Sequence, residues 1–312
     1  MFDKIITVSM NPAIDATLWL SGLDFNEPNQ VLKEKTYAGG KGVNISRVLA
    51  SYGMPSVATG ICGEENFPYF KRLLESDGVN HDFIVENGST RENLSVTLPD
   101  GKMLKINRQG TPVDFDTMSR LREKILAECQ GHERVLVAFA GSIPPNLSAD
   151  AYKAFIHQVK RENVEIALDT TVFGLEDLKE IKPFVIKPNL SEFRKICGNP
   201  LRTEQVTVKY CRTLTSSVRY VMISLGGKGL LCCTGDQAIR VIPPVVQVKS
   251  TVAAGDTTLA TFLYALCQGK DDTAAAAYAA AAGTASVTLD GTAIVTSDAV
   301  EKMIPQMTVK ML

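Results

Sequence analysis

A short stretch in the last third of the chain has the residue types to hold a phosphate group and to take up a proton. Ala253, Ala254 and Gly255 carry almost no side chain, and Asp256 follows them at the start of an amphipathic run. Small residues let a ligand approach the backbone amides, and the positive end of a helix dipole favours an anion there. Asp256 would then accept a proton from an attacking hydroxyl. The alternative is structural, with Asp256 as the N-cap of a helix that follows a short strand at 245–248.

A glycine-rich run near the N-terminus could bind an anionic ligand. Residues 39–44 are Gly-Gly-Lys-Gly-Val-Asn and precede a predicted helix. The glycines permit close approach of the backbone, and the lysine offers a cation. The run is not a Walker A loop, because Gly-Lys-Ser/Thr occurs nowhere in the chain, and it does not fit Gly-x-Gly-x-x-Gly. A purely structural entry into the helix is the alternative.

Two polar segments carry groups that could bind hydroxyl groups or an anion. Asp15 follows the first predicted strand, and its carboxylate can accept hydrogen bonds from neighbouring hydroxyl groups; an Asx-type turn is the alternative. Arg91 and Arg108, with Lys102 and Lys105, lie in the second segment and could reach an anion. Charges of this kind also keep an exposed strand edge soluble, which is the alternative here.

A pair of magnesium-type ligands follows another predicted strand. Asn189 and Glu192 are three residues apart and share one face of a beginning helix. Amide and carboxylate oxygens suit a hydrated Mg²⁺, which keeps most of its waters. The same pair also fits a capping box, in which Glu192 reaches back to the start of the helix, and this alternative stays open.

Two further turns follow predicted strands. Residues 224–229, Ser-Leu-Gly-Gly-Lys-Gly, expose backbone against which a nucleotide phosphate could lie. Residues 141–145, Gly-Ser-Ile-Pro-Pro, form a rigid turn that is most often only a turn.

The bulk properties argue against several classes of protein. The 312 residues have a formal net charge of −1, which indicates no nucleic-acid partner. The 7 cysteines form neither a CxxC pair nor a His/Cys cluster, so neither a structural zinc nor a disulfide framework is indicated. The N-terminus goes directly into a strand pattern, and no apolar run reaches membrane-spanning length. We expect a cytoplasmic protein with no membrane partner.

A sheet with helices on both faces must position these residues. Short apolar runs alternate with helix-like patterns, which is typical of an α/β protein with a mostly parallel sheet. The predicted strands are 5–8, 57–61, 135–139, 164–168, 184–186 and 220–225. The predicted helices are 43–53, 66–77, 114–130, 148–162, 190–197, 203–217, 256–269, 272–289 and 297–306, with a hairpin at 230–241 that turns at Gly235-Asp236. Ligands of such sheets bind beyond the carboxyl ends of the strands, which the candidate residues follow.

Two segments interrupt the alternation. Residues 14–36 and 89–108 alternate polar with apolar residues and contain turn residues, which predicts antiparallel strands with one exposed face. They lie far apart in the sequence, yet they could pair into one small sheet. We therefore expect a single domain, residues 1–312, with a β lid made from two insertions.

The order of these motifs resembles that of the ribokinase-like, or PfkB, family of carbohydrate kinases. Residues 39–44 look like the family's N-terminal glycine signature, and residues 254–257 look like its C-terminal signature. Asn189 and Glu192 look like its NxxE magnesium motif, and residues 224–229 look like its nucleotide-binding turn. The resemblance implies a ribokinase-like α/β fold and an ATP-dependent kinase.

Within this family the chain is similar to the phosphosugar branch, which contains the 1-phosphofructokinases, the tagatose-6-phosphate kinases and the minor 6-phosphofructokinase. Residues 11–15, 39–44 and 141–145 carry this similarity. The implied reaction is phosphorylation of a hydroxyl of fructose 1-phosphate, tagatose 6-phosphate or fructose 6-phosphate to a bisphosphate. Two alternatives stay open: a kinase for an unphosphorylated sugar or nucleoside, and a non-catalytic sugar-phosphate sensor.

The resemblance implies a role for each candidate residue. Asp256 would be the proton acceptor, beside an anion hole at Ala253, Ala254 and Gly255. The substrate would contact Asp15, Gly39, Gly40, Lys41, Asn44, Arg91, Arg108 and Ser142. ATP would contact Lys187, Asn189, Ser224, Gly226, Gly227, Gly229 and Thr251, and Mg²⁺ would be held at Glu192 and Asn189. The family also implies a lid that closes over the sugar, a homodimer formed through the lid, and a monovalent cation near residues 250–256.

The chain departs from the family pattern at several positions. Ala stands where the family usually has Gly before Ala-Gly-Asp, and Thr261 replaces the Gly of its usual Ala-Gly-Phe. We expect the added methyl groups, among them that of Ala254 at the anion hole, to leave the amides free. Arg108 and Asn146 also differ from the common pattern, so the sequence predicts a class of substrate rather than one sugar.

Overall fold

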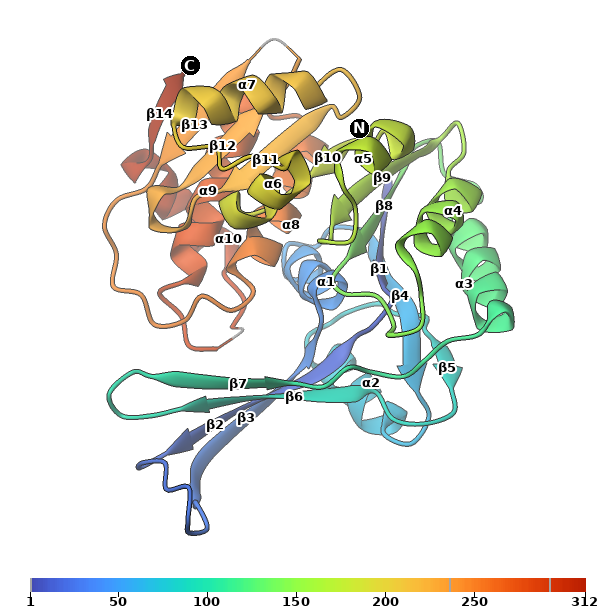
Figure 1. Ribbon diagram of the computed structural model, residues 1–312, viewed down its shortest axis with the longest axis vertical. Helices are drawn as coiled ribbons and strands as arrows, with labels where there is room; N and C mark the ends of the chain where they lie inside the picture. The colour runs from blue at the N-terminus through green and yellow to red at the C-terminus, as the bar shows by residue number, and fades with distance from the viewer. Residues whose placement is uncertain (1, 236, 292) are drawn as a thin grey trace.

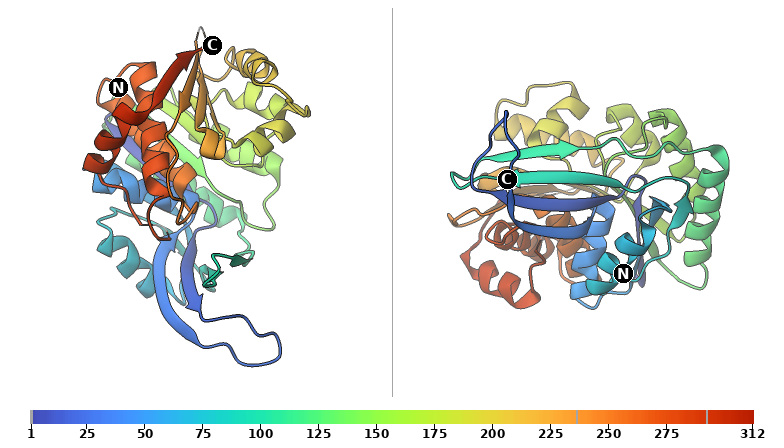
Figure 2. Two further views of the ribbon diagram at one scale, coloured as in Figure 1. Left: turned by 90° about the vertical axis from the view of Figure 1, so that its left-hand side faces the viewer. Right: turned by 90° about the horizontal axis from the view of Figure 1, so that it is seen from below.

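The computed structural model describes residues 2–235, 237–291 and 293–312. At the centre of this described part lies a ten-stranded sheet in the order β14-β13-β12-β11-β10-β9-β8-β1-β4-β5. Helices cover both faces of the sheet, and a four-stranded sheet projects away from the body (Figure 1, Figure 2). The predicted α/β class with a small additional β sheet is confirmed.

The strands from β11 to β5 in this order run parallel, and the strands at the other edge are antiparallel. The parallel strands are β1 (Lys4–Ser9), β4 (Ser56–Gly63), β5 (Ile84–Glu86), β8 (Val135–Ala140), β9 (Val164–Asp169), β10 (Val185–Ile186) and β11 (Tyr220–Ser224). The antiparallel strands are β12 (Leu230–Cys233), β13 (Ala238–Ile242) and β14 (Thr308–Met311). Strands covered on both faces are expected to be continuously apolar, and every residue of β8 is indeed buried.

The helices divide between the two faces according to the alternation of side chains along each strand. In β8, residues 135, 137 and 139 face α3 (Phe115–Glu128), α4 (Ala149–Val159), α5 (Leu175–Ile181), α6 (Leu190–Cys197) and α7 (Glu204–Leu214). Residues 136, 138 and 140 face α1 (Lys41–Ser51), α8 (Ala254–Cys267), α9 (Asp272–Ser286) and α10 (Ser297–Met303). Helix α2 (Phe67–Ser76) packs with α1 in a smaller core near the lid.

The small sheet has the order β3-β2-β6-β7 and is built from the two segments that interrupt the βα alternation. Its strands are β2 (Ala13–Leu20), β3 (Val31–Gly39), β6 (Arg91–Thr97) and β7 (Met103–Asn107). Each segment forms an antiparallel pair, and the two pairs join through β2 and β6, which run parallel. We call this sheet the lid.

Most predicted elements are present, with ends that differ by a few residues. The prediction missed the short elements α5, β5 and β14, whose lengths of 7, 3 and 4 residues give little periodicity. The predicted hairpin exists as β12 and β13, although Asp236 of its turn lies outside the described residues. In the described part of the chain we find no helix with the length and apolarity needed to cross a membrane.

One predicted strand is wrong. Residues 245–248 form no strand, and Val245 and Val248 are exposed rather than buried. Pro243 and Pro244 follow the end of β13, and a proline has no backbone N–H to donate to a neighbouring strand. The segment therefore leaves the sheet and runs over the surface toward α8.

Candidate active site

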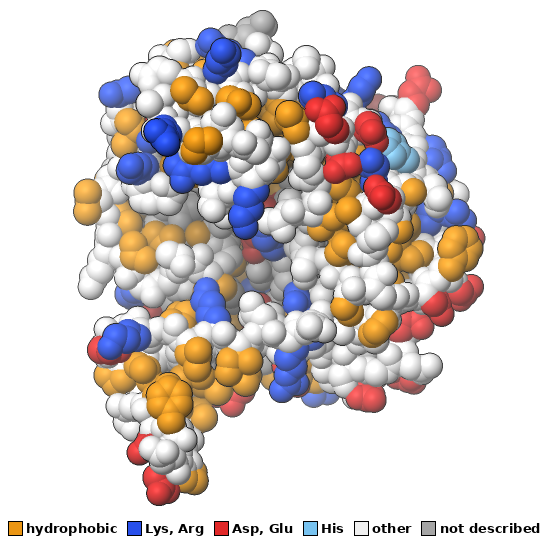
Figure 3. All heavy atoms as spheres, in the orientation of Figure 1, with side chains coloured by type: hydrophobic (Ala, Val, Ile, Leu, Met, Phe, Trp, Pro, Cys, Tyr) orange, Lys and Arg blue, Asp and Glu red, His pale blue; other side chains and the backbone are white. Residues whose placement is uncertain are grey.

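A cleft of about 330 Å³ lies between the lid and the carboxyl ends of the central strands. Figure 3 shows the surface hollowed between these two parts of the molecule. The residues that line it come from the loops after β1 and β8, from the lid, and from the first turns of α1 and α8: Ser9, Asn11, Asp15, Gly40, Lys41, Asn44, Arg91, Asn93, Asn107, Ala140, Gly141, Ser142, Val252, Ala253 and Asp256. The structure thus brings together residues that lie far apart in the sequence.

Asp256 lies at the floor of this cleft and is 6% exposed. Asn44, from the first turn of α1, donates a 2.8 Å hydrogen bond to its Oδ2. Burial raises the pKa of Asp256 to about 7, and the negative charge of Asp169 adds to this effect. A carboxylate whose pKa lies near neutral is able to take up a proton and to release it again.

Helix α8 begins earlier than the sequence indicates. Its first residue is Ala254 and its N-cap is Ala253, so Asp256 is the third residue of the helix rather than its cap. The cap makes no side-chain hydrogen bond, which leaves the first amides of α8 without a side-chain partner. The structural alternative, in which Asp256 is the N-cap, is therefore wrong, and the carboxylate of Asp256 lines the cleft instead.

The methyl group that affects the backbone here belongs to Ala253, not to Ala254. Ala253 has a φ of 60°, in the left-handed region that a side chain disfavours by about 1 kcal/mol. A glycine at this position would adopt the same conformation without that cost. Gly255 has a different role, because a Cβ placed there would lie 3.0 Å from Nζ of Lys187.

Asp169 joins two lysines beside Asp256, and the sequence analysis did not identify it. It is the last residue of β9 and is 2% exposed. Nζ of Lys41 lies 2.7 Å from its Oδ1, and Nζ of Lys187 lies 3.1 Å from its Oδ2. Burial alone raises the pKa of Asp169, but Lys187 and Lys41 outweigh it and hold the pKa below its usual value. Lys41 and Lys187 thus lie on either side of one buried carboxylate.

The lid side of the cleft carries a row of polar groups. Asp15, Asn93 and Asn107 are neighbours across β2, β6 and β7 and line the cleft. Nδ2 of Asn93 donates a 2.8 Å hydrogen bond to Oδ1 of Asp15, and burial raises the pKa of that carboxyl group. A glycine is required at position 39, because a Cβ there would collide with the carboxylate of Asp15.

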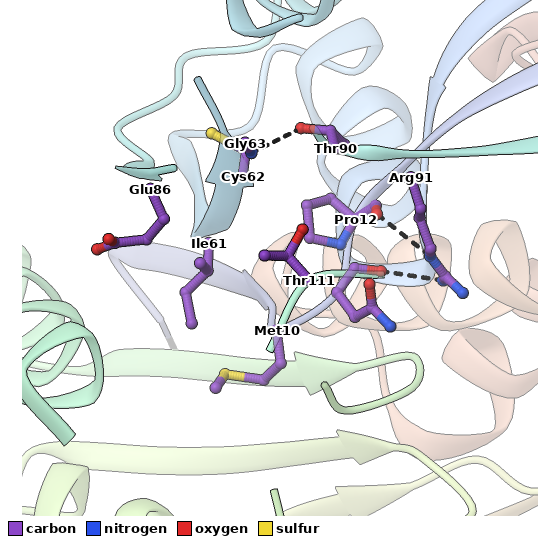
Figure 4. Close-up of a pocket in the computed structure, with 10 residues that line it drawn as sticks. Met10, Pro12, Ile61, Cys62, Gly63, Glu86, Thr90, Arg91 and Thr111 are labelled. Carbon is purple, nitrogen blue, oxygen red and sulfur yellow. Dashed lines mark hydrogen bonds between the residues drawn. The ribbon is translucent and has the colours of Figure 1, made fainter. Parts of the chain in front are cut away.

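Arg91 ties the lid to the body of the protein. Its guanidinium donates hydrogen bonds to the carbonyl oxygens of Asn11 at 3.0 Å, Arg108 at 3.0 Å and Pro12 at 3.3 Å. It also reaches Oγ of Ser142 at 3.2 Å. Figure 4 shows Arg91 at the edge of a second pocket, which at about 10 Å³ has room for no more than about one water molecule.

Arg108 does not line the cleft. Its guanidinium is exposed and lies 3.4 Å from Oε2 of Glu92. Its backbone contributes instead, since its carbonyl oxygen accepts the bond from Arg91.

The predicted nucleotide residues lie around the carboxyl ends of β10 and β11. Asn189 is the neighbour of Ser224 in an isolated bridge, and Oγ of Ser224 is buried with no hydrogen-bond partner among the described residues. Residues 226–228 form a 3₁₀ turn that is exposed. Thr251 is exposed as well and does not line the cleft described above.

Asn189 and Glu192 form the capping box that the sequence left open. The amide of Glu192 donates to Oδ1 of Asn189, and the amide of Asn189 donates to Oε2 of Glu192, both at 2.9 Å. The described residues contain no group of three or more His, Cys, Asp or Glu that could hold a metal ion. The capping bonds use one oxygen of Glu192, and its other oxygen could bind a water of a hydrated Mg²⁺.

Residues 6–299 match the model of the pfkB family of carbohydrate kinases. The chain belongs to this family. It is 30% identical over 284 residues to a 1-phosphofructokinase of Borreliella burgdorferi, with 90% of this chain and 91% of that protein covered. Its fold is similar to that of phosphofructokinase-2 from Escherichia coli in complex with substrates and products, with a TM-score of 0.90, 22% identity, and 97% and 98% of the two chains covered. The same enzyme in complex with potassium gives a TM-score of 0.89 at 22% identity, with 98% and 99% covered.

Family membership confirms the resemblance noted in the sequence, and it identifies the chain as a carbohydrate kinase for which ATP is the expected phosphoryl donor. The sequence analysis missed two residues that line the cleft of this pfkB-family kinase, Asn93 and Asn107, and it missed Asp169, the buried partner of the cleft residue Lys41. Asp169 could have been found, because it directly follows an apolar strand, the position where ligand-binding residues of α/β sheets gather. Asn93 and Asn107 could not, because their place in the cleft depends on how the lid strands pair.

Proposed function

We propose that this protein transfers the γ-phosphoryl group of ATP to a hydroxyl group of a ketohexose phosphate and so produces a bisphosphate. The observation that carries the proposal is the position of Asp256. It is a buried carboxyl group at the start of a helix, and it faces the same cleft as the hydroxyl-binding and cationic residues of the lid.

Asp256 would accept the proton of the attacking hydroxyl through Oδ1, because the hydrogen bond from Asn44 engages Oδ2. Phosphoryl transfer has a loose transition state, so catalysis depends mainly on positioning and on stabilising the charge of the transferring group. The first amides of α8 would supply donors for that charge. Lys41 and Lys187, which Asp169 holds at the same place, would add two cations.

A substrate that already carries a phosphate fits Arg91. Its guanidinium forms no salt bridge with a carboxylate of the described residues, and its hydrogen-bond partners are three carbonyl oxygens and one hydroxyl group. A cation with only neutral partners at the edge of a cleft is well suited to a dianion. Asp15 and Asn93 would bind hydroxyl groups of the sugar, since Oδ1 of Asn93 is buried and lacks a partner in the described part of the chain.

ATP and Mg²⁺ would occupy the side of the site formed by β10, β11 and α8. The residues that would hold them are Lys187, Asn189, Glu192, Ser224, Gly226, Gly227, Gly229 and Thr251. Their fit rests on the unpartnered buried hydroxyl group of Ser224 and on the buried lysine. When bound, Mg²⁺ would neutralise phosphate charge. A monovalent cation near residues 250–256 remains part of the proposal.

The outer face of the lid supports a homodimer. Leu104 and Ile106 on β7 are exposed and alternate with the cleft-facing Asn107, so they lie on the face turned away from the cleft. Leu18 on β2 and Val96 on β6 continue this apolar face in register with Leu104. Hydrophobic side chains gather on the lid in Figure 3. A second copy of the lid would cover them, and the sedimentation coefficient of Leu104→Glu would then fall to that of a monomer.

The decisive experiment measures ADP release with Mg-ATP and a panel of sugars. The panel contains fructose 1-phosphate, fructose 6-phosphate and tagatose 6-phosphate, with fructose and ribose as unphosphorylated controls. We expect turnover with one or more phosphorylated sugars, and a large loss of it in Arg91→Ala. Turnover with the unphosphorylated sugars alone would favour a kinase for an unphosphorylated sugar. Tight binding of a sugar phosphate without any ADP release would favour a sensor.

A further inference from the structure

Arg47 belongs to a network of contacts that the proposed reaction does not yet use. It lies on α1, one turn after Asn44, and is 2% exposed. Its Nε donates a 2.6 Å hydrogen bond to Oδ2 of Asp77, the residue at the end of α2. Its Nη1 donates to Oδ1 of Asn44 at 3.4 Å. Its guanidinium carbon also lies 5.1 Å from the centre of the Tyr37 ring on β3.

The contact with Arg47 decides which way the Asn44 amide points. A guanidinium contains only donors, so the amide must turn its oxygen toward Arg47. Its NH₂ group then faces Asp256 and donates the 2.8 Å bond to Oδ2. In the opposite orientation two donors would face each other at Arg47, and two acceptors would face each other at Asp256. Arg47 therefore selects the orientation that leaves Oδ1 of Asp256 for the substrate.

The same side chain reaches the lid. Tyr37 is the cross-strand neighbour of Asp15, so the ring that lies over Arg47 is carried by the strand next to that of the hydroxyl-binding carboxylate. The positive charge of Arg47 also favours the ionised form of Asp15 and opposes the rise in pKa caused by burial. One buried cation is thus in contact with the base of the lid and with the amide that holds Asp256.

We propose that Arg47 is a positioning residue that fixes the Asn44 amide for Asp256 and ties the base of the lid to the same point. It acts through Asn44 and does not itself touch the substrate. The titratable and charged groups that face it are Asp77 from α2, Tyr37 from β3, Asp15 from β2 and, through Asn44, Asp256 from α8. This inference rests on the proposed function.

The first test is steady-state kinetics of Arg47→Met with Mg-ATP and the sugar phosphate that the wild-type enzyme turns over. Methionine keeps much of the apolar stem and removes the guanidinium. We expect kcat to fall about 10- to 100-fold, the usual cost of a small displacement at a reacting group. The KM for ATP should stay within about twofold, because the ATP side is not touched. The matched control is Arg72→Met, which removes an exposed arginine stacked on Tyr69 and should leave kcat unchanged.

A double-mutant cycle with Asn44→Ala separates positioning from general destabilisation. If Arg47 acts through Asn44, adding Arg47→Met to Asn44→Ala lowers kcat no further. If the decreases in kcat of the two single variants multiply in the double variant, the proposal is overturned. A folded Arg47→Met with the kcat of the wild type would also overturn it. If Arg47→Met does not fold by circular dichroism, Asp77→Asn takes its place. We then expect a fall in kcat of about 3- to 10-fold, and no fall in the Asn44→Ala background. A wild-type kcat in folded Asp77→Asn would equally overturn it.

A readout without turnover keeps the inference separate from the proposed function. The bond from Asn44 lowers the pKa of Asp256, so its loss in Arg47→Met should raise that pKa further. The pKa can be followed from the free energy of unfolding as a function of pH. The wild type is compared with Asp256→Asn, and Arg47→Met is compared with the double variant that carries both substitutions. An unchanged pKa would contradict the role of Arg47 whether or not a sugar is phosphorylated. The proposed function fails by a different result, the absence of ADP release by the wild type on every sugar phosphate.

Discussion

Asn44 donates a 2.8 Å hydrogen bond to Asp256, although 212 positions separate the two residues in the chain. The bond joins the first turn of α1 to the first turn of α8, and both turns open into one cleft. It holds one oxygen of the carboxylate and leaves the other for a substrate.

Asp256→Asn should lower kcat by about two to four orders of magnitude, the usual range for a positioned general base. The KM and the binding constant for ATP should change little, because asparagine has nearly the same size as aspartate and leaves the amides of α8, Lys41 and Lys187 in place. Single-turnover kinetics and calorimetric titration of ATP measure the two effects. Near-normal turnover in this variant would remove Asp256 from the mechanism.

The pH dependence of kcat should show an acid limb near pH 7. Burial raises the pKa of Asp256 to about 7, and only the ionised carboxylate can accept a proton. Activity should therefore fall as the pH decreases below about 7.

The contribution of Asp256 to the stability of the protein changes with pH in the opposite direction. Because the folded pKa lies above the unfolded value of 3.8, the folded state binds more protons between these two values, so this group makes the protein less stable as the pH rises through that window.

The stability difference gives an independent check on the same group. Asp256→Asn should become more stable relative to the wild type as the pH rises from 4 to 8, as measured by urea unfolding at several pH values. An acid limb that stays in place in Asp256→Asn, or a stability difference that does not depend on pH, would assign the titration to another residue.

Asp169→Asn should destabilise the protein by about 3 kcal/mol, because removal of one partner of a buried ion pair leaves the other charge without compensation. Two lysines lose their partner here, at 2.7 and 3.1 Å. The free energy of unfolding in urea measures this loss. The control is Glu75→Gln, which breaks the exposed pair with Lys71 and should change stability by no more than about 0.5 kcal/mol. Equal effects of the two substitutions would show that Asp169 has no special role in the fold.

Gly39→Ala should weaken binding of the sugar. A Cβ at residue 39 would collide with the carboxylate of Asp15, which must then leave the position that Asn93 holds. We expect the KM for the sugar phosphate to rise by about tenfold or more, with the KM for ATP unchanged. Gly22→Ala is the matched control, because no atom lies within 4 Å of a Cβ placed there. A KM for the sugar that stays at the wild-type value in Gly39→Ala would place the substrate away from Asp15.

The sequence by itself determined the architecture and much of the chemistry. Apolar runs of strand length between amphipathic helices predict a sheet covered on both faces, because such runs must be buried on both sides. The motifs after these strands placed Asp15, residues 39–44 and Asp256 at one edge of the sheet, where the comparisons and the cleft support the same kind of enzyme.

Local patterns could not decide how individual side chains are used. The Asn189 and Glu192 pair fits a cap and a metal ligand equally well in sequence, and only the folded helix shows both capping bonds. The strand predicted at 245–248 failed because strand formation requires a partner, and the chain leaves the sheet at the preceding prolines.

Only the tertiary structure decided which distant groups share a hydrogen bond or a charge. Asp169 is the partner of Lys41 and Lys187 because the end of β9, the start of α1 and the residue after β10 lie next to one another in the fold. Asn93 faces the cleft because β6 pairs with β2 in a register that places it beside Asp15. Burial, which raises the pKa of Asp256 toward neutrality, is likewise a property of the packed molecule. The sequence determines which residue types are present, but distances, burial and register arise only when the segments pack against one another.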